Sequence, residues 1–286
     1  MATVNADNVM VAGIILQQMF VYPVKSLAGI EVSTWPVDKT GFRHDRQWML
    51  IDQENRFLSQ RRLPKMVLIK PELSDAALQL SAPGMTPIQI PLQPETADTV
   101  AVEIWHDHCQ AVLLEQKVNQ WFSDFLKIDC RLVFHPQQAV RPVDPAYAAP
   151  TDQVAFADGF PFLLLSQASL DTLNHAMGLS LPMIRFRPNL VISGCSAYAE
   201  DSWRKIQIGD ISFRLPKPCS RCAVPTIDPA TAERSSEPMQ TLQKTRKWQK
   251  HVYFGQNALH DKSGRLTVGM PVDVIKTGPV QPPLTI

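Results

Sequence analysis

The sequence predicts a mainly β protein of the α+β class, with few and short helices. Many short segments rich in Val, Ile, Phe and Tyr follow one another at close spacing and are interrupted by Pro or Gly, which is typical of barrels and sandwiches. Strands and helices do not alternate regularly, which argues against a doubly wound nucleotide-binding fold. With 286 residues, 45% of them hydrophobic, the chain can build one large domain or two moderate ones.

The first half is predicted to be rich in strands, with one helix. The helix is expected over 115–127, because apolar residues recur there at helical spacing. The polar turn 53–55 predicts a hairpin, and the Pro-rich segment 137–153 is interpreted as a linker or ordered loop and a candidate domain boundary. The expected strands are 15–26 (limited by Pro23), 46–52, 57–60, 67–73, 77–80, 87–92, 100–105 and 131–135.

The second half adds strands and two helices. Ser166 is expected to cap a helix over 167–177, and Gly178 to end it. A short helix is expected within 235–244, capped by Ser235 or Ser236. The expected strands are 160–166, 189–193, 203–208, 211–215 and 266–276, with Gly209-Asp210 as a two-residue hairpin turn.

Charge and cysteine content exclude several classes of protein. The net charge of +1 gives no bulk attraction to nucleic acid or to an anionic membrane, so neither is expected as a partner. Five cysteines, of which only two lie close together, do not suit a secreted disulfide scaffold. The apolar run Val9 to Leu16 is too short to span a bilayer. We therefore expect a cytoplasmic protein.

The segment Pro216 to Cys222, PKPCSRC, is the sharpest local motif. Lys217 and Arg221 stand beside its two cysteines, and nearby cations favour the thiolate form of a cysteine. Half of a zinc site, a thioredoxin-like dithiol, one reactive or metal-binding cysteine, and two buried structural cysteines all fit this pattern. Zinc would need further ligands that no second motif supplies, and a redox dithiol would open a helix. The local pattern alone does not choose among them.

Two weaker patterns remain. The segment 105–109, WHDHC, fits either a metal site or an ordinary turn at the end of a strand, and the turn is favoured. Basic residues also gather near strand ends, where they form either an anion pocket or solvated surface. Taken singly, each of these basic residues is better explained as solvated surface charge. The residues are Lys25, Arg43, Arg46, Arg61, Arg62, Arg185 and Arg187.

Taken together, four segments resemble a known family. VYPVKSLAGIEV, HDRQWMLID, FRPNLVISGCSAYAEDSW and IGDISFRLPKPCSRCAVPTIDPATAE are similar to segments of MOSC proteins that carry an N-terminal MOSC β-barrel domain, the family of bacterial YcbX and the mitochondrial amidoxime-reducing component. The similarity runs from about Met19 to Val274. It implies an N-terminal MOSC β-barrel-type domain over 12–135, followed over 136–276 by a MOSC β-barrel domain with short helices.

The resemblance implies a molybdenum cofactor, a molybdenum ion held by one molybdopterin. Cys222 matches the family's metal ligand and catalytic cysteine, while Gly159-Phe160 replaces small hydroxyl residues of the amidoxime-reducing proteins. The basic spots would then meet on one anionic ligand between the two domains. The implied cofactor-binding residues are Lys25, Ser26, Arg46, Asp158, Arg187, Asn189 and Ser220.

The activity implied by the resemblance is reduction of N-hydroxylated compounds, such as hydroxylamines, amidoximes and N-hydroxylated bases, to amines. A sulfur or cofactor carrier with a persulfide-forming cysteine is the alternative, and a zinc- or thiol-stabilised module without enzymatic activity is a third. No cysteine follows Cys222, so no four-cysteine iron–sulfur cluster of the YcbX type is expected. Electrons would come from a separate flavin or iron–sulfur protein. Neither a membrane anchor nor a requirement for pyridoxal phosphate is expected.

Overall fold

The fold is mainly β, as predicted. The computed structural model describes residues 13–94 and 98–283. Within them, three α-helices and four short 3₁₀ helices accompany the strands. The helices are α1 (Gln116–Leu126), α2 (Gln167–Met177) and α3 (Met239–Thr245). The strands are β1 (Ile15–Val21), β2 (Ile30–Val32), β3 (Thr34–Asp38), β4 (Gly41–Phe42), β5 (Trp48–Ile51), β6 (Lys70–Leu73), β7 (Ala77–Ser81), β8 (Ile88–Pro91), β9 (Thr99–Ile104), β10 (Asp107–Leu113), β11 (Arg131–Phe134), β12 (Phe162–Ser166), β13 (Leu190–Ser193), β14 (Trp203–Ile208), β15 (Ile211–Ser220), β16 (Lys247–Trp248), β17 (His251–His260), β18 (Gly264–Thr267) and β19 (Val272–Thr277).

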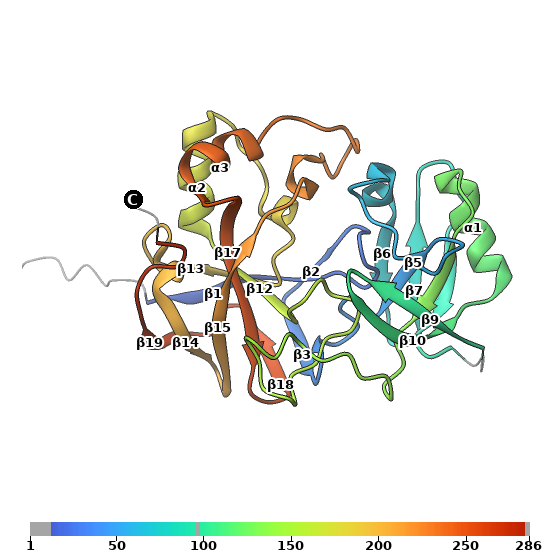
Figure 1. Cartoon of the computed structure of the whole chain (residues 1–286), viewed down its shortest axis with the longest axis horizontal. Coiled ribbons are helices and arrows are strands. Elements are labelled where there is room, and N and C mark those ends of the chain that lie inside the picture. The colour runs from blue at the N-terminus through green and yellow to red at the C-terminus, as the bar shows by residue number, and fades with distance from the viewer. Residues whose placement is uncertain (1–12, 95–97, 284–286) are drawn as a thin grey trace, which may run out of the picture.

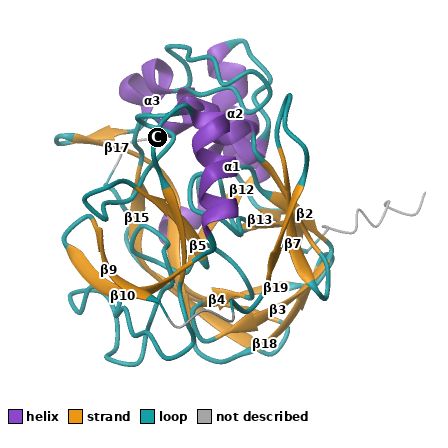
Figure 2. Ribbon diagram, turned by 90° about the vertical axis from the view of Figure 1, so that its right-hand side faces the viewer, coloured by secondary structure: helices purple, strands orange, loops and turns teal. Residues whose placement is uncertain are grey.

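The strands form two lobes, which lie side by side in Figure 1. The larger lobe is built on one sheet in the order β19-β14-β15-β17-β12-β13-β1-β2, with β16 paired to β17, and on the small sheet β18-β3-β4. The smaller lobe contains the sheets β5-β11-β10-β9 and β6-β7-β8, with α1 packed against them. The three helices lie toward the same side of the molecule in both views (Figure 2).

Each lobe has its own hydrophobic core. In the larger lobe, Phe162 packs edge-on against Phe42 and Phe213 beneath the long sheet. In the smaller lobe, Trp48 and Phe122 belong to a separate buried cluster under α1. Two cores of this kind fit a chain of this length, because a single core stops growing at about 250–300 residues.

The first strands of the chain belong to the larger lobe. Met19 of β1 pairs antiparallel with Leu190 of β13, and β3 pairs with β18 near the other end of the chain. The alternating apolar residues of β1 can be buried only by a partner sheet, and the second half of the chain supplies it. The domain bounds 12–135 and 136–276 stay predictions; the hydrogen-bonded sheets group the strands β1 to β4 with the second half, while Val24 and Leu27 belong to the core of the smaller lobe.

The predicted cap of α2 is confirmed, and the predicted cap of α3 is wrong. The Ser166 hydroxyl accepts a hydrogen bond from the Ser169 backbone N–H, and Gly178 ends α2 with a φ of 65°, so both expectations for α2 are confirmed. The expected cap of α3 at Ser235 or Ser236 is wrong. Its N-cap is Pro238, and the Glu237 carboxylate accepts from the Thr241 backbone N–H instead.

Several expected strands have different bounds. Segment 57–60 forms only a bridge at Phe57, residues 64–68 form a 3₁₀ helix, and residues 268–271 turn between β18 and β19. β15 runs on to Ser220 although it contains two prolines, which lack a backbone N–H. Register shifts on both sides of Lys217-Pro218 interrupt the regular pairing with β17, so the strand can continue without those N–H groups. β10 and β17 were not predicted, because Asp, His and Gln interrupt the apolar pattern of β10, and His, Gln and Asn interrupt that of β17.

No helix within residues 13–94 and 98–283 is both long enough and apolar enough to cross a membrane.

A glycine in β17 predicts a test of the central packing. Gly255 has a φ of +84°, and an added Cβ would lie 2.7 Å from Leu165 Cδ2 and 2.8 Å from the Leu164 carbonyl oxygen. Gly84 has a similar φ of +74° but open space around it. Gly84→Ala should lower the free energy of unfolding by about 1–2 kcal/mol through backbone strain alone. Gly255→Ala should cost about 1–3 kcal/mol more through overpacking. Urea denaturation measures both, and equal losses would contradict this account of the packing.

Candidate functional site

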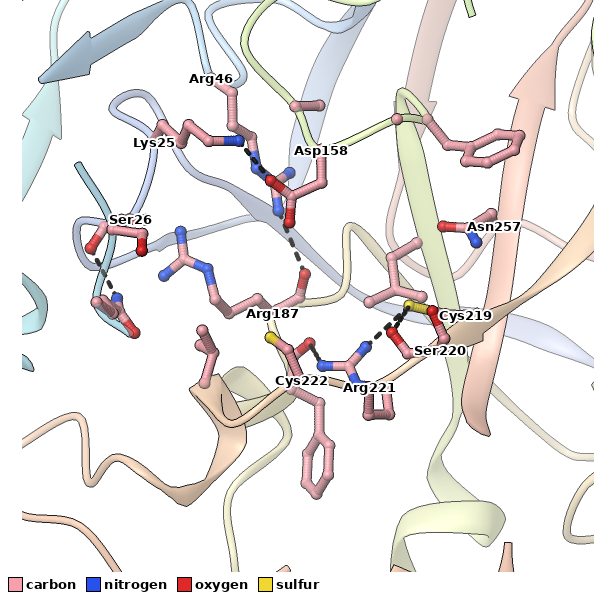
Figure 3. Close-up of a pocket in the computed structure, with 18 of the residues that line it drawn as sticks. Lys25, Ser26, Arg46, Asp158, Arg187, Cys219, Ser220, Arg221, Cys222 and Asn257 are labelled. Carbon is pink, nitrogen blue, oxygen red and sulfur yellow. Dashed lines mark hydrogen bonds and ion pairs between the residues drawn. The ribbon is translucent and has the colours of Figure 1, made fainter. Parts of the chain in front are cut away.

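One pocket between the two lobes collects every site residue named from the sequence. Its walls enclose about 880 Å³ of space, including the open mouth. Figure 3 shows Lys25, Ser26 and Arg46 on one side, the segment from Cys219 to Cys222 on the other, and Arg187 between them. The eight named residues among its lining are Lys25, Ser26, Arg46, Asp158, Arg187, Asn189, Ser220 and Cys222.

Lys25 and Asp158 form an ion pair in the wall of the pocket. Lys25 Nζ lies 2.5 Å from Asp158 Oδ1 and donates a second hydrogen bond to the Phe156 carbonyl at 2.8 Å. Burial lowers the pKa of Lys25, and the Asp158 carboxylate opposes that shift. The surrounding protein tends to raise the pKa of Asp158, but Lys25, Arg61 and the Trp105 indole hold it well below its ordinary value. The Asp158 carboxylate is therefore ionised at neutral pH, and it faces the pocket.

Tyr22 organises two arginines. The guanidinium carbons of Arg46 and Arg187 lie 4.2 and 4.3 Å from the centre of its buried ring. The Tyr22 hydroxyl donates to the Pro188 carbonyl at 3.0 Å, which fixes the ring. Such cation–π contacts draw both guanidinium groups to one ring, and the Asp45 carboxylate further offsets the charge of Arg46. Burial raises the pKa of Tyr22 and lowers that of Arg187 to about 10, so the phenol stays neutral and the guanidinium stays charged.

The two arginines differ in how many of their donors are free. Arg46 Nη1 donates to Asp45 at 2.5 Å and to Asn189 at 3.0 Å. Arg187 donates through Nη1 to the Leu27 carbonyl at 2.6 Å, and this is its only side-chain hydrogen bond to the described part of the chain. Arg187 therefore retains more N–H groups for a ligand. Arg46 is held in place by Asp45 and Asn189 and contributes mainly its positive charge.

Asn189 lies at the base of the pocket, and its amide is already bonded within the protein. Its Nδ2 donates to the Phe20 carbonyl, and its Oδ1 accepts from Arg46 and from the Leu163 backbone N–H. With 2% of its surface exposed, it orients Arg46 and joins β1 to β12. Its predicted contact with a cofactor stays a prediction.

Three of the pocket residues have left-handed backbones. The φ angles of Ser26, Arg46 and Arg187 are 68°, 48° and 58°. Residues other than glycine adopt this region at an energetic cost, and they concentrate at functional sites. The hydrogen bond from Gln60 Nε2 to the Ser26 carbonyl, at 2.7 Å, helps to hold one of these turns.

The cysteine segment forms the facing wall. Cys219 and Ser220 end β15, and Cys222 follows after Arg221. Arg221 Nη1 lies 3.3 Å from Cys219 Sγ, and Nη2 donates to the Phe186 carbonyl at 2.7 Å. Burial raises the pKa of the Cys219 thiol, although Arg221 opposes the shift. The Cys222 thiol makes no hydrogen bond with residues 13–94 or 98–283, so its sulfur is available as a soft ligand.

Sequence reasoning missed several residues that shape the pocket. Tyr22 and Asp45 stand inside the quoted segments VYPVKS and HDRQW, so the signal was present but not assigned. Arg141 and Trp105 carried no comparable signal, because each contacts the Asp158 loop only through the tertiary fold. Lining residues not assigned from the sequence include Phe57, Gln60, Phe186, Val224 and Asn257.

The other candidates do not join the site. His106 and His108 are exposed in and after the β9–β10 turn, and the described residues contain no cluster of three His, Cys, Asp or Glu suited to a metal ion. Arg43 pairs with Asp38 on the surface, and Arg185 binds the carbonyls of Pro225 and Thr226. Of the basic residues named earlier, Lys25, Arg46, Arg61 and Arg187 line the pocket.

The arrangement favours an anionic ligand that also offers a site for sulfur. Five cationic side chains and one carboxylate line the pocket; they are Lys25, Arg46, Arg61, Arg187, Arg221 and Asp158. Guanidinium groups bind phosphate bidentately, and a thiolate is a preferred ligand of soft metals. Phe57, Phe160 and Phe186 add apolar faces to the same walls. An elongated ligand with an anionic end and a metal end fits this donor set.

Comparison with known proteins gives two family matches. Residues 13–129 match the MOSC N-terminal beta barrel domain, and residues 151–273 match the MOSC domain. Mitochondrial amidoxime-reducing component 1 of Homo sapiens is 35% identical over 278 residues, which are 89% of this chain and 81% of the relative. Molybdenum cofactor sulfurase of Danio rerio is 33% identical over 273 residues, which are 88% of this chain but 32% of that protein.

Among solved structures, the YUAD protein from Bacillus subtilis is similar over 91% of this chain and 93% of that one, at 10% sequence identity and a TM-score of 0.41. That likeness is too low to add to the argument.

The stacked arginines predict the effect of changing Tyr22. Tyr22→Leu removes both cation–π contacts, each worth about 0.5–1 kcal/mol, so the affinity for inorganic pyrophosphate should fall about five- to thirtyfold. Tyr22→Phe keeps the ring and loses only the hydroxyl, so it should lower the free energy of unfolding by about 1 kcal/mol and leave the affinity unchanged. Isothermal titration calorimetry of the folded variants measures this. Unchanged affinity in Tyr22→Leu would mean that the ring does not position the arginines.

Proposed function

From the premise that the chain belongs to the family of MOSC-domain proteins with an N-terminal MOSC β-barrel domain, we propose that it is a molybdenum-cofactor-dependent reductase of N-hydroxylated compounds. The net reaction is R–NHOH + 2 e⁻ + 2 H⁺ → R–NH₂ + H₂O, in which the N–O bond breaks and nitrogen is reduced. Amidoximes, the substrates in the name of the human relative, are N-hydroxylated amidines. The observation that carries the proposal is one pocket in which the Cys222 thiol, without a hydrogen bond to the described part of the chain, faces a cluster of cations.

The residues present fit the molybdenum cofactor. When bound, this cofactor would supply the metal that accepts the oxygen atom and exchanges the electrons. Cys222 would ligate the metal through sulfur, and Ser220 and Ser26 have side chains at the walls of the pocket. Arg187 and Lys25 would bind the terminal phosphate, with Arg46 behind them. Cationic groups from several distant segments would then share one phosphate, which surface charge alone does not explain.

The protein's own groups have distinct tasks in this proposal. Arg187 binds and orients the phosphate with its free N–H groups, while Asn189 and Asp45 hold Arg46 in place. Asp158 keeps Lys25 charged in a buried position. Phe57, Phe160 and Phe186 exclude water from part of the wall. A small N-hydroxylated substrate would enter through the open mouth, and a separate electron-transfer protein would return the electrons. The cytoplasmic location stays a prediction.

A second candidate function is transfer of sulfur or of the cofactor itself. It is favoured by the similarity to molybdenum cofactor sulfurase and by two cysteines in one pocket. In that case a cysteine would carry a persulfide, and no N-hydroxylated compound would be consumed. The match covers a third of the sulfurase but four fifths of the amidoxime-reducing relative, and for this reason we place reduction first.

Cysteine variants test the proposed reductase. Protein from cells that make the cofactor should contain molybdenum in near-stoichiometric amount and reduce a soluble amidoxime when given an artificial electron donor. Cys222→Ser should abolish turnover, because a hydroxyl is a far poorer ligand than thiolate. Cys219→Ser should keep most of it, since that thiol is held by Arg221.

Metal analysis and amidoxime consumption give the readouts for these variants. Zinc in place of molybdenum, or equal loss of turnover in both variants, would overturn the assignment. Persulfide on a cysteine without amidoxime consumption would favour the carrier.

Arginine variants test the phosphate contacts. Arg187→Ala should lower cofactor retention about tenfold to a hundredfold, because a charge-assisted hydrogen bond contributes about 1.5–3 kcal/mol. Arg187→Lys should recover only part, since Lys lacks the guanidinium fork. Arg46→Ala should also lower retention, but it leaves buried Asp45 unpaired and so destabilises the fold as well.

The exposed Lys262→Ala is the control and should change nothing. Molybdenum content after stringent washing is the readout. Full occupancy in both Arg187→Ala and Arg46→Ala would contradict the phosphate site.

A further inference from the structure

Arg141 is a buried arginine in the segment that the sequence suggested was a linker. It lies between β11 and β12, and only 2% of its surface is exposed. Arginine is almost never so deeply buried unless its charge and donors are satisfied. The contacts that satisfy Arg141 therefore show which part of the molecule depends on it.

Those contacts converge on the loop that carries Asp158. Arg141 Nη1 donates to the carbonyls of Ala155 and Ala157 at 2.9 and 2.5 Å, and Nη2 donates to the Asp158 carbonyl at 3.3 Å. One guanidinium thus holds three carbonyls within four consecutive residues. A fork of fixed geometry that binds several backbone acceptors leaves the loop little freedom to change shape.

The other partner of Arg141 lies in the smaller lobe. Asp107, the first residue of β10, accepts from Arg141 Nε at 2.9 Å and lies 2.7 Å from Nη2. Trp105 of the same hairpin turn donates from Nε1 to Asp158 Oδ1 at 3.3 Å. The tip of the β9–β10 hairpin therefore contacts Asp158 in two ways. Trp105 binds the Asp158 carboxylate directly, and Asp107 is linked to the Asp158 backbone carbonyl through Arg141.

The loop held in this way supplies both hydrogen-bond acceptors of Lys25. These are the Phe156 carbonyl at 2.8 Å and Asp158 Oδ1 at 2.5 Å, and Arg141 binds the residues on either side of Phe156. A displacement of about 1 Å would turn either contact into one that is too long for a hydrogen bond. The charge that Lys25 presents to the pocket thus depends on the position of this backbone.

We propose that Arg141 is a positioning residue of the pocket: it fixes residues 155–158 so that Asp158 and the Phe156 carbonyl stay in contact with Lys25. Arg141 is not among the residues that line the pocket. The inference rests on the proposed function only in that Lys25 belongs to the site. The chemistry it controls is the protonation of a buried amine.

A purely electrostatic role for Arg141 makes the opposite prediction. The groups that act on Lys25 are Asp158, which favours its charged form, and Arg141 and Arg46, which disfavour it; the Phe57 ring lies 5.1 Å away. If Arg141 acted by charge alone, its removal would make Lys25 harder to deprotonate. If Arg141 positions Asp158, its removal separates the ion pair, and Lys25 then loses its proton at lower pH. The sign of the shift distinguishes the two roles.

The test measures the titration of Lys25 directly, without cofactor or substrate. Full-length protein from cells that do not make the cofactor is labelled briefly with acetic anhydride between pH 6 and 11, and acetylation of Lys25 is quantified by peptide mass spectrometry. In Asp158→Asn the labelling midpoint should fall by about one pH unit or more, because the variant removes the negative charge that lies 2.5 Å from Lys25 Nζ. Arg141→Met should shift the midpoint in the same direction. A rise, or no change, would overturn the proposal.

Further variants keep the test decisive if Arg141→Met folds poorly. Arg141→Lys retains the charge but loses the fork, so its midpoint should also fall, and Asp107→Asn should shift it less and in the same direction. The double variant Asp158→Asn with Arg141→Lys should shift the midpoint by less than the sum of the two single shifts, because the two changes share the Asp158 contact and only the Phe156 contact is left for Arg141→Lys to weaken. Independent, additive shifts would overturn the proposal.

Arg246→Lys is the matched control. Arg246 is buried and paired with Asp201, away from the pocket, so this variant should lose stability and keep the wild-type midpoint for Lys25. A shift of the midpoint in this control would show that the readout follows general destabilisation, and would also overturn the proposal. Since labelling needs no metal and no turnover, failure of the proposed reductase activity would leave this result unaffected.

Discussion

Repulsion between like charges is the constraint on which the pocket depends. Lys25, Arg46 and Arg187 lie around one cavity, and repulsion between charges is stronger in such a partly buried site than in water. Each cation has its own compensation: Asp158 for Lys25, Asp45 for Arg46, and the Tyr22 ring with the Leu27 carbonyl for Arg187. The pocket is thus preorganised for an anion, with its cations already fixed where the ligand would need them.

The compensating groups explain why the two lobes cannot be treated separately. Lys25 depends on an acid from the loop before β12, and Arg46 depends on an amide next to β13. Those segments meet only because β1 enters the large sheet beside β13, which is itself paired with β12. The site is therefore a property of the sheet order, and residues far apart in sequence act as one electrostatic unit.

The fold class and much of the site could be predicted because they rest on local signals. Ser166 caps α2 by a rule that spans three residues, and the Gly209-Asp210 turn joins β14 to β15 as its sequence indicates. Seven of the eight site residues lie in the four segments that resemble the family, Asp158 lies just before the apolar strand 160–166, and the structure brings all eight into one pocket. Their roles on a cofactor stay predictions.

What escaped prediction depends on partners distant in sequence. β17 contains His, Gln and Asn, and its position between β12 and β15 is fixed by those neighbours. Arg141 is one residue in a Pro-rich segment without periodicity, and its burial follows from carbonyls that only the folded loop aligns. Asn189 is predicted to bind a ligand, and its Oδ1 and one bond from Nδ2 are already engaged within the protein, contacts that no sequence pattern indicates.

The pairing of β3 with β18 has a consequence for biosynthesis. Residues 34–38 emerge from the ribosome long before residues 264–267, so β3 can pair early with β4 on one edge, but its other edge stays unpaired until almost the whole chain has been made. Contacts between residues so far apart in sequence form slowly, because closure of a long loop costs entropy before the contact stabilises it. Lys25 and Cys222 likewise meet only late in synthesis. A chain that stalls midway exposes the apolar face of β1 and has no complete pocket, so a ligand that needs both walls can be inserted only after translation has passed Cys222.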